Sequence, residues 1–197
     1  KVTYEPFPFN RQIYSCGHPA LSKDGKKLIF SSDMPGGFGE GDLYMSEMAE
    51  GKWSQPVNLG PVVNTFGDEV FPYWLNDTTL FFSSDGQVGY GGLDIYKSVW
   101  RHGIWSVPEN MLKPLNSSYD DFGLIFREDQ KDGFFSSNRP GGKGDDDIYA
   151  IRYYPGKAVN PAEKEKKAKL WISPYYACGY VKDKSTMQPL KDATVFI

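Results

Sequence analysis

The sequence holds few of the residues on which catalytic and metal sites most often depend. Its 197 residues include two cysteines and two histidines, and a disulfide between Cys16 and Cys178 cannot be deduced from the sequence. His18 and His102 occur at unrelated places and lack metal-ligand spacing. No Gly-x-Ser-x-Gly motif accompanies them. We therefore predict no catalytic residue, no metal site, no cofactor and no enzymatic activity for this chain.

Long apolar runs and an excess of one charge are also absent. No apolar run approaches the roughly 18 residues of a membrane-spanning helix. The 22 basic and 25 acidic residues leave a net charge of −3, which gives no general attraction to nucleic acid or anionic lipid. Long helical periodicity is missing, whereas 21 glycines and 14 prolines indicate frequent turns. We therefore expect an all-β protein.

What the sequence does contain is one repeat in three copies. LIFSSD, LFFSSD and GFFSSN end 52 and 53 residues apart, and DLY, DIY and DIY recur with the same offsets. The recurring positions are Asp33, Gly37, Asp42, Tyr44 and Trp53 in the first copy, Asp85, Asp94, Tyr96 and Trp105 in the second, and Asn138, Gly142, Asp147 and Tyr149 in the third. His18 aligns with Phe71 and Gly123, at the first strand of each copy. Several independent anchors keep one register, so we interpret these positions as structural.

Each copy divides into four short β-strands joined by tight turns. In the first copy the expected strands are Pro19–Ser22, Lys27–Ser32, Leu43–Met48 and Lys52–Val57. A repeated unit of four antiparallel strands is typical of a β-propeller, whose blades bury their faces against each other. We predict propeller blades over residues 1–154, with copies near 16–66, 67–119 and 120–154.

The glycine-rich segment of each copy resembles a phosphate-binding loop at first sight. A phosphate loop needs a helix N-terminus behind it, but each of these segments is followed by a predicted strand. We therefore expect a wide turn in which glycines adopt positive φ. Asp42, Asp94 and Asp147 should accept hydrogen bonds from the backbone amides of that turn.

The two ends of the repeat region depart from the blade pattern. Propellers usually have four to eight blades, and three are visible here. Residues 1–15 resemble the tail of another unit, so either upstream blades are missing or an N-terminal strand closes the last blade; a piece of a larger propeller is favoured. Residues 155–172 have the composition of a linker. Residues 173–197 return to β character and predict the start of a β-sandwich.

Acidic and aromatic residues of the repeat have alternative interpretations. The pairs Asp68–Glu69 and Asp120–Asp121 recur at the entry to the first strand, which favours a turn-fixing role over a catalytic one. The acids of GDDDIY favour a solvated turn over calcium binding. Four aromatic residues fit blade packing better than a sugar or peptide platform: Tyr73, Trp74, Trp100 and Tyr119.

The first copy, HPALSKDGKKLIFSSDMPGGFGEGDLYMSE, resembles the PD40 family of WD40-like propeller repeats, which TolB-like propellers share. The loop pattern is similar to that of propellers in OmpA-family proteins of Bacteroidetes, although the second loop, GQVGYGGLD, lacks the Pro-Gly-Gly. The closing stretch resembles the start of a carboxypeptidase-regulatory-like domain at these residues: Gly179, Val181, Asp183, Thr186, Pro189, Leu190, Ala193 and Val195. This domain order resembles the PorE family of type IX secretion subunits.

The resemblance implies a non-enzymatic protein-interaction scaffold in the periplasm, associated with the outer membrane. Its partners would be other secretion or envelope proteins, and peptidoglycan would be reached only indirectly, through a domain outside this chain. Two alternatives stay open. One is a carbohydrate- or peptidoglycan-binding propeller, and the other is a TolB-like propeller that binds a peptide.

Overall fold

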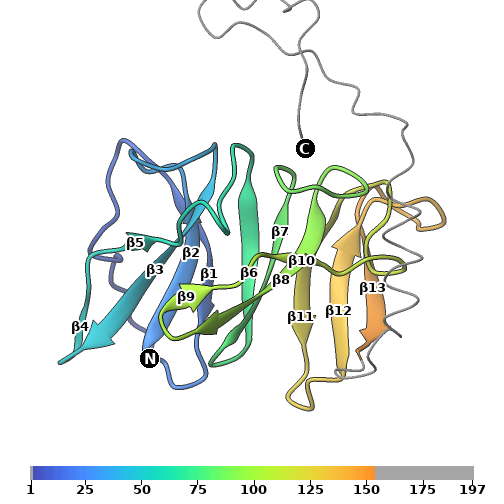
Figure 1. The fold of residues 1–197 in the computed structure, drawn as a ribbon. Helices are drawn as coiled ribbons and strands as arrows, with labels where there is room; N and C mark the ends of the chain where they lie inside the picture. Colours follow the sequence, from blue (N-terminus) through green and yellow to red (C-terminus); the bar gives the residue numbers. More distant parts are fainter. Residues whose placement is uncertain (1, 154–197) are drawn as a thin grey trace, which may run out of the picture. The chain divides into compact units, whose positions relative to one another are not determined.

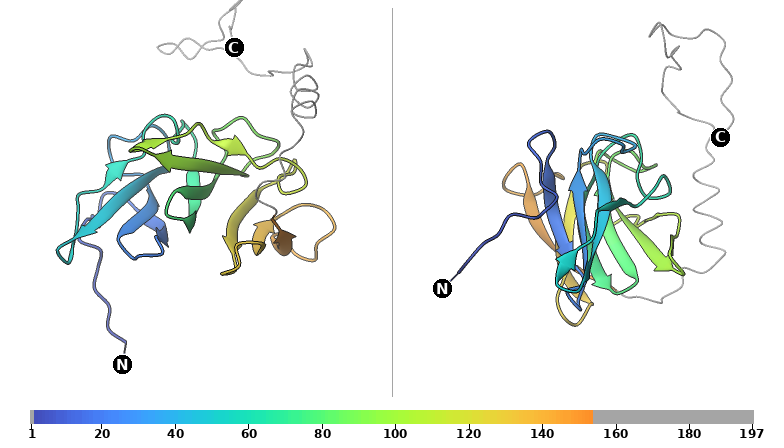
Figure 2. Two further views of the ribbon diagram at one scale, coloured as in Figure 1. Left: turned by 60° about the horizontal axis from the view of Figure 1, so that its bottom comes forward. Right: turned by 90° about the vertical axis from the view of Figure 1, so that its left-hand side faces the viewer.

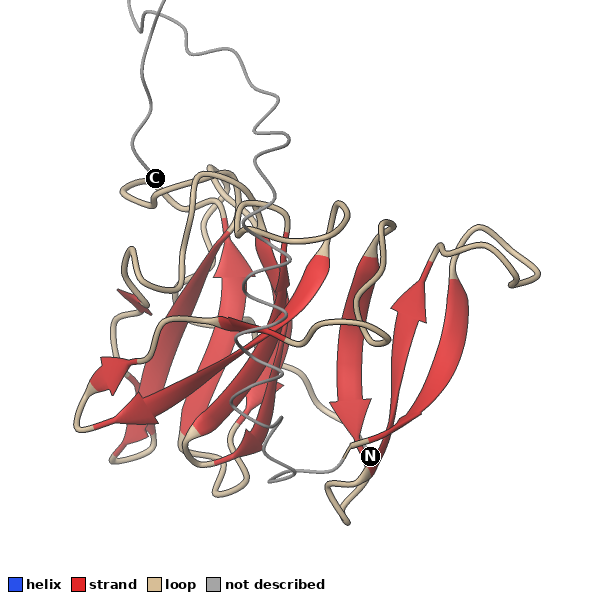
Figure 3. Ribbon diagram, turned by 45° about the vertical axis from the view of Figure 1, so that its right-hand side comes forward, coloured by secondary structure: helices blue, strands red, loops and turns tan. Residues whose placement is uncertain are grey.

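The computed structural model describes residues 2–153, and every regular element in that range is a β-strand (Figure 3). The chain divides into two compact units, Lys1–Pro155 and Gly156–Ile197. The linker and the β-sandwich predicted after residue 154 lie outside the described residues. For the described part, the all-β prediction is confirmed.

Three antiparallel sheets follow one another along the chain (Figure 1). The first contains β1 (Cys16–Leu21), β2 (Lys27–Ser32), β3 (Asp42–Ala49), β4 (Lys52–Trp53) and β5 (Val57–Asn58). The second contains β6 (Glu69–Asn76), β7 (Thr79–Ser84), β8 (Asp94–Arg101), β9 (Ile104–Trp105) and β10 (Glu109–Asn110). The third contains β11 (Asp121–Phe126), β12 (Asp132–Ser137) and β13 (Asp147–Arg152). In each sheet the glycine-rich loop joins the second long strand to the third.

The first hairpin of each sheet is closed by a short polar side chain that hydrogen-bonds its own turn. Asp24, Asn76 and Asp129 accept hydrogen bonds from the backbone N–H two residues further on, at 3.0, 3.0 and 2.9 Å. Such Asx turns hold the backbone in a tight reversal. The tight turns predicted between the first and second strands are therefore present in all three sheets.

The prediction of one continuous fourth strand is wrong. Instead of one strand over Lys52–Val57, the first sheet has two, β4 and β5, which both pair with β3. Pro56 separates them and has no N–H to donate to a ladder. Pro108 stands in the same place between β9 and β10 of the second sheet, which is split in the same way. The first strand also begins earlier than predicted, at Cys16 rather than Pro19.

The core lies between neighbouring sheets. We call the side of a sheet that faces the following sheet its forward face, and the opposite side its rear face. The forward face of the first sheet contributes Ala20, Ile29, Leu43 and Met45 to one buried cluster, and the rear face of the second contributes Trp74, Leu80, Phe82 and Tyr96. A second cluster joins Phe81 and Ile95 to Leu124 and Phe135 of the third sheet. Burial of each large side chain contributes about 2 kcal/mol.

Sheets packed face to face in chain order are the arrangement of neighbouring propeller blades. The left view of Figure 2 shows the sheets succeeding one another from blue through green to orange. The described residues form no closed ring of sheets. The repeated, face-packed sheets are thus seen directly, and the complete propeller stays a prediction.

Candidate functional site

The glycine-rich loops wrap around the aspartates that end them. Asp42 accepts hydrogen bonds from the backbone N–H groups of Phe38 and Gly39, at 2.6 and 3.1 Å. Asp147 accepts one from Lys143 N at 2.7 Å, and Asp94 is bonded in the same way by the amides that precede it. The hydrogen bonds expected for these aspartates are present. The backbone N–H groups that a phosphate would need are therefore already bonded to the aspartate side chains.

The first two loops also touch the sheet that follows, where a glycine permits close approach. A Cβ built on Gly39 would lie 2.4 Å from the carbonyl oxygen of Gly67, and one on Gly91 would lie 2.2 Å from that of Tyr119. At the same repeat position in the third loop, the nearest atom to such a Cβ on Gly144 is 3.5 Å away. Among residues 2–153, the close approach therefore occurs at the two loops that contact the segment leading into a following sheet.

We expect Gly39→Ala to lower the free energy of unfolding by about 2 kcal/mol, because the methyl group must push apart two backbone segments. Gly144→Ala is the matched control and should change stability by less than about 0.5 kcal/mol. Urea unfolding followed by tryptophan fluorescence measures both variants. Equal effects of the two substitutions would contradict the close loop contact.

The other recurrent residues are also bound into the fold. Asp33, Asp85 and Asn138 accept hydrogen bonds from the backbone N–H groups of residues 15, 68 and 120, at 2.6, 2.7 and 2.8 Å. Side chains at Gly37 or Gly142 would collide with the loop aspartates. Tyr44, Tyr96 and Tyr149 stack on the phenylalanines at 30, 82 and 135. Trp53 meets Phe7, and Trp105 meets Trp74 and Trp100.

Two buried asparagines, which the sequence analysis missed, cap the third strand of the first two sheets. Asn64 accepts a hydrogen bond from Leu43 N at 2.8 Å and donates one to Leu43 O at 3.0 Å. Asn116 makes the same pair of bonds with Ile95, both at 2.8 Å. Each side chain thus replaces a neighbouring strand at one residue. The signal in the sequence was the recurrence of Asn in VVNTF and PLNSS, 52 residues apart.

The recurrent acidic pairs fix the entry to the first strand. Glu69 is fully buried and accepts hydrogen bonds from Thr65 N, Thr65 Oγ1 and Ser84 Oγ, at 2.8, 2.6 and 2.7 Å. Burial raises the pKa of Glu69, and its hydrogen bonds act in the opposite direction. Asp121 is also buried, accepts a hydrogen bond from Ser117 Oγ, and forms an ion pair with Arg139. Both carboxylates therefore have structural roles.

A further surface of the three sheets is formed by residues of their first strands, outside the hydrogen-bonded loops described above. His18 and Phe71 have positive φ values of 49° and 51°, and Gly123 has 66°. Each lies where the pairing of the first and second strands shifts register, which is a β-bulge. The bulge turns the side chain out of the sheet. The alignment of these three positions in the sequence therefore corresponds to one structural position.

The bulges line up aromatic rings from β1, β6 and β11. The His18 ring stacks on Phe71 with centroids 4.1 Å apart, and Phe71 stacks on Phe122 at 5.1 Å. Glycine occupies the bulge of the third sheet, so the preceding residue supplies the ring there. We call His18, Phe71 and Phe122 the first-strand row.

A hollow of about 230 Å³ adjoins the first-strand row. Its lining consists of His18, Pro19, Phe71, Pro72, Gly123, Leu124 and Ile125. Burial lowers the pKa of His18, and the nearby negative charge of Asp68 partly offsets that, so the imidazole is neutral at neutral pH. The lining holds no carboxylate and no nucleophile. This surface can bind apolar or aromatic side chains, with one imidazole as the hydrogen-bonding group.

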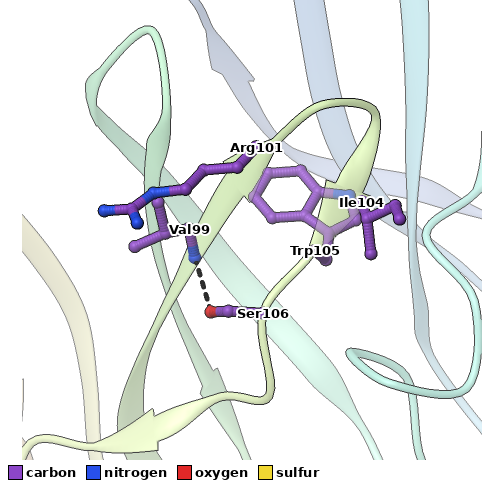
Figure 4. A pocket seen from close by; sticks show the side chains of 5 residues that line it. All are labelled: Val99, Arg101, Ile104, Trp105 and Ser106. Carbon is purple, nitrogen blue, oxygen red and sulfur yellow. Dashed lines mark hydrogen bonds between the residues drawn. The ribbon is translucent and has the colours of Figure 1, made fainter.

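A second hollow, of about 410 Å³, lies at the hairpin of β8 and β9 (Figure 4). Val99, Arg101, Ile104, Trp105 and Ser106 line it. Ser106 Oγ accepts a hydrogen bond from Val99 N at 3.0 Å, and Trp105 is part of the core. Its polar groups are Arg101, at the surface, and a serine already bonded within the hairpin, so we do not assign a ligand to it.

The aromatic residues considered as a platform do not share a surface. Trp74 is in the core between the first two sheets, whereas Tyr73 packs in the next cluster and donates a hydrogen bond to Phe126 O at 3.1 Å. Trp100 packs against the first cluster, and Tyr119 lies in a loop. Among residues 2–153, no group of three or more His, Cys, Asp or Glu side chains is placed to hold a metal ion. The same residues include no helix that could cross a membrane.

Comparisons with known proteins give this chain no family. No family model and no curated protein matches it. Among solved structures, a prolyl endopeptidase aligns with 71% of this chain and 18% of its own, at 14% identity and a TM-score of 0.47. A puromycin-hydrolysing peptidase of Mycobacterium tuberculosis aligns with 72% of this chain and 21% of its own, at 16% identity and a TM-score of 0.48. This chain spans about a fifth of either protein, and likenesses this distant carry no activity over to it.

Proposed function

We propose that this chain is part of a non-enzymatic protein-interaction scaffold, and that the first-strand row is a docking surface for apolar side chains of a partner protein. The observation that carries the proposal is the row itself: three rings from three separate strands stack in a line at the repeated bulge, and two of them, His18 and Phe71, line the adjoining hollow. Aromatic rings at a concave surface are typical of protein-binding sites.

The hydrogen bonding of the polar residues supports a binding function rather than catalysis. The recurrent aspartates, asparagines and buried acids are hydrogen-bonded within the fold, and the row holds an imidazole without a nucleophile beside it. Following the resemblance of the repeat, we propose that the scaffold acts in the periplasm at the outer membrane, within type IX secretion machinery. Its partners would be secretion or envelope proteins, and a domain outside this chain would provide the link to peptidoglycan.

A propeller that binds an extended peptide is the second candidate, because the row crosses three neighbouring strands and could receive successive side chains of one segment. A carbohydrate site is less well supported. Sugar recognition combines an aromatic face with carboxylate or amide side chains that hydrogen-bond the hydroxyl groups. The lining of this hollow contains no carboxylate and no amide side chain.

The proposal is tested by pull-down of purified type IX secretion and envelope proteins on the immobilised chain. We expect Phe71→Ala to weaken binding at least tenfold, on the order of the loss caused by truncating a central interface aromatic. Phe66→Ala is the matched control, since Phe66 is an exposed phenylalanine in a loop. Thermal unfolding of both variants verifies their folding. Binding by no partner, or equal binding by both variants, would count against the proposal.

A further inference from the structure

Each sheet makes the same hydrogen bond where its first strand begins. The polar residue that follows the second strand accepts it from the backbone N–H of the residue that precedes the first strand, at 2.6, 2.7 and 2.8 Å in the three sheets. We call this pair of residues the entry contact. Its members are Asp33 and Ser15 in the first sheet, Asp85 and Asp68 in the second, and Asn138 and Asp120 in the third. Of the three sheets, only the second pairs two acids.

The third sheet shows how the side chains of an entry contact join. Asn138 Oδ1 accepts the hydrogen bond from Asp120 N, and Asn138 Nδ2 donates one to Asp120 Oδ2 at 2.9 Å. The other carboxylate oxygen of Asp120 accepts a hydrogen bond from Leu93 N at 2.9 Å, at the end of the glycine-rich loop of the second sheet. Asp120 therefore links its own sheet to the loop of the preceding sheet.

The second sheet lacks the donor of this side-chain bond. Asp85 holds the place of Asn138, and its Oδ1 still accepts the hydrogen bond from Asp68 N. Its second oxygen therefore corresponds to the amide nitrogen of Asn138. Two ionised carboxylates cannot hydrogen-bond each other, because neither has a proton to donate. The side-chain bond of this entry contact requires a proton on one of the two acids.

The surroundings of Asp68 favour a proton there. Asp68 precedes β6 and forms a bridge with Gly41, at the end of the glycine-rich loop of the first sheet. The charged groups that face Asp68 are Asp85 after β7, Glu40 in that loop, and His18 on β1. Partial burial raises the pKa of Asp68, the charges of Asp85 and Glu40 raise it further, and His18 acts in the opposite direction. Asp68 therefore takes up a proton at a higher pH than an isolated aspartate does.

We propose that the entry contact of the second sheet is a pH-sensitive contact: on acidification Asp68 takes up a proton, donates a hydrogen bond to Asp85, and stabilises the place where the loop of the first sheet meets the second sheet. At higher pH both acids are ionised and repel each other. The other two entry contacts lack this response, since Ser15 has no carboxyl group and Asn138 carries its own donor. The contact lies beside the first-strand row, because His18 faces Asp68.

Asp85→Asn gives the second sheet the entry contact of the third. We expect it to raise the urea midpoint of the 197-residue chain at pH 7, because the new amide donates a hydrogen bond to ionised Asp68. In the unaltered chain the raised pKa of Asp68 makes its contribution to stability complete below the ordinary 3.8, and this contribution is lost as pH rises through the raised value. The advantage of Asp85→Asn should therefore shrink as pH falls from 7 to 4.

Substitutions at the other two entry contacts are matched tests. Asn138→Asp creates a second pair of acids, opposite Asp120, and should lower the midpoint at pH 7 by an amount that shrinks on acidification. Asp33→Asn makes the same chemical change as Asp85→Asn, but opposite Ser15, and should lack this pH dependence. Urea unfolding followed by circular dichroism measures all three variants. An equal pH dependence for Asp33→Asn and Asp85→Asn would overturn the proposal.

Two further measurements separate Asp68 from the imidazole that faces it. The carboxyl ¹³C NMR signal of Asp68 follows its proton directly, and its titration midpoint should fall in Asp85→Asn. His18→Phe gives the first sheet the residue of the second at that position, and the pH-dependent advantage of Asp85→Asn should persist in this background. An unchanged midpoint for Asp68 would overturn the proposal. Disappearance of the pH dependence in His18→Phe would also overturn it, because the titrating group would then be the imidazole.

Discussion

Glu69→Ala should lower the free energy of unfolding by about 3 kcal/mol. The substitution removes the acceptor for Thr65 N, Thr65 Oγ1 and Ser84 Oγ, and each buried donor left unsatisfied costs roughly 1–3 kcal/mol. A cavity remains where the side chain was. Urea unfolding of the whole chain, followed by circular dichroism, measures the change.

The first sheet offers a matched control for this substitution. Cys16 occupies the position of Glu69, and its thiol lies 3.7 Å from Ser32 Oγ. Cys16→Ala should cost less than about 1 kcal/mol, because no group depends on the thiol for its only hydrogen bond. If the two substitutions destabilised the protein equally, the carboxylate network would not be a distinct source of stability.

Glu69 also predicts a pH dependence of stability. Because burial raises its folded-state pKa above the ordinary 4.5, the folded protein binds the proton more tightly than the unfolded chain. The contribution to stability is complete below pH 4.5 and is lost as pH rises through the raised pKa. Glu69→Gln lacks this titration, so the stability difference between the unaltered chain and Glu69→Gln should vary with pH in that window and level off above it. A constant difference would contradict the raised pKa.

Arg139→Ala should destabilise the protein by about 3 kcal/mol. Arg139 forms an ion pair with Asp121, whose side chain is fully buried, and donates hydrogen bonds to the carbonyl oxygens of Leu115 and Pro114 at 2.6 and 2.9 Å. Removal of one partner leaves a buried charge without its counter-charge, which typically costs 3–5 kcal/mol. The remaining hydrogen bonds from Ser117 to Asp121 keep the expected loss near the lower end of that range.

Two further arginine substitutions test whether the stability loss of Arg139→Ala comes from its ion pair and hydrogen bonds. Arg139→Lys keeps the charge but loses the fork that reaches several acceptors, so an intermediate loss is expected. Arg127→Ala removes an arginine that is exposed and should change stability by less than about 0.5 kcal/mol. Thermal and urea unfolding of the three variants gives the ranking. Equal losses for Arg139→Ala and Arg127→Ala would show that the ion pair contributes nothing specific.

The repeat made the local features of the fold predictable. The tight turns at Asp24, Asn76 and Asp129, and the loops that wrap around Asp42, Asp94 and Asp147, follow from side chains that bond backbone groups two to four residues away. Such geometry depends on a few consecutive residues, so the amino-acid order is sufficient to specify it. The interruption of the fourth strand was missed, although Pro56 and Pro108, which cannot donate a ladder hydrogen bond, were a local signal for it.

The candidate site was less accessible to sequence reasoning. The sequence placed His18, Phe71 and Gly123 at one repeat position, but nothing local indicated a bulge there. The ring of the third copy comes instead from Phe122. A stack of three rings exists only because β1, β6 and β11 lie side by side, and that proximity comes from the packing of whole sheets rather than from neighbouring residues.

Residue order along this chain was thus enough to establish an all-β protein built from three copies of one unit, since hydrophobic pattern, turn chemistry and spacing act over short distances. The packing of the sheets decided which equivalent residues are buried and which are exposed: Leu43 and Ile95 are covered and Ile148 is not, although all three hold the same repeat position. Burial depends on the neighbour across the interface, and a sequence pattern that repeats itself does not say which copy has such a neighbour.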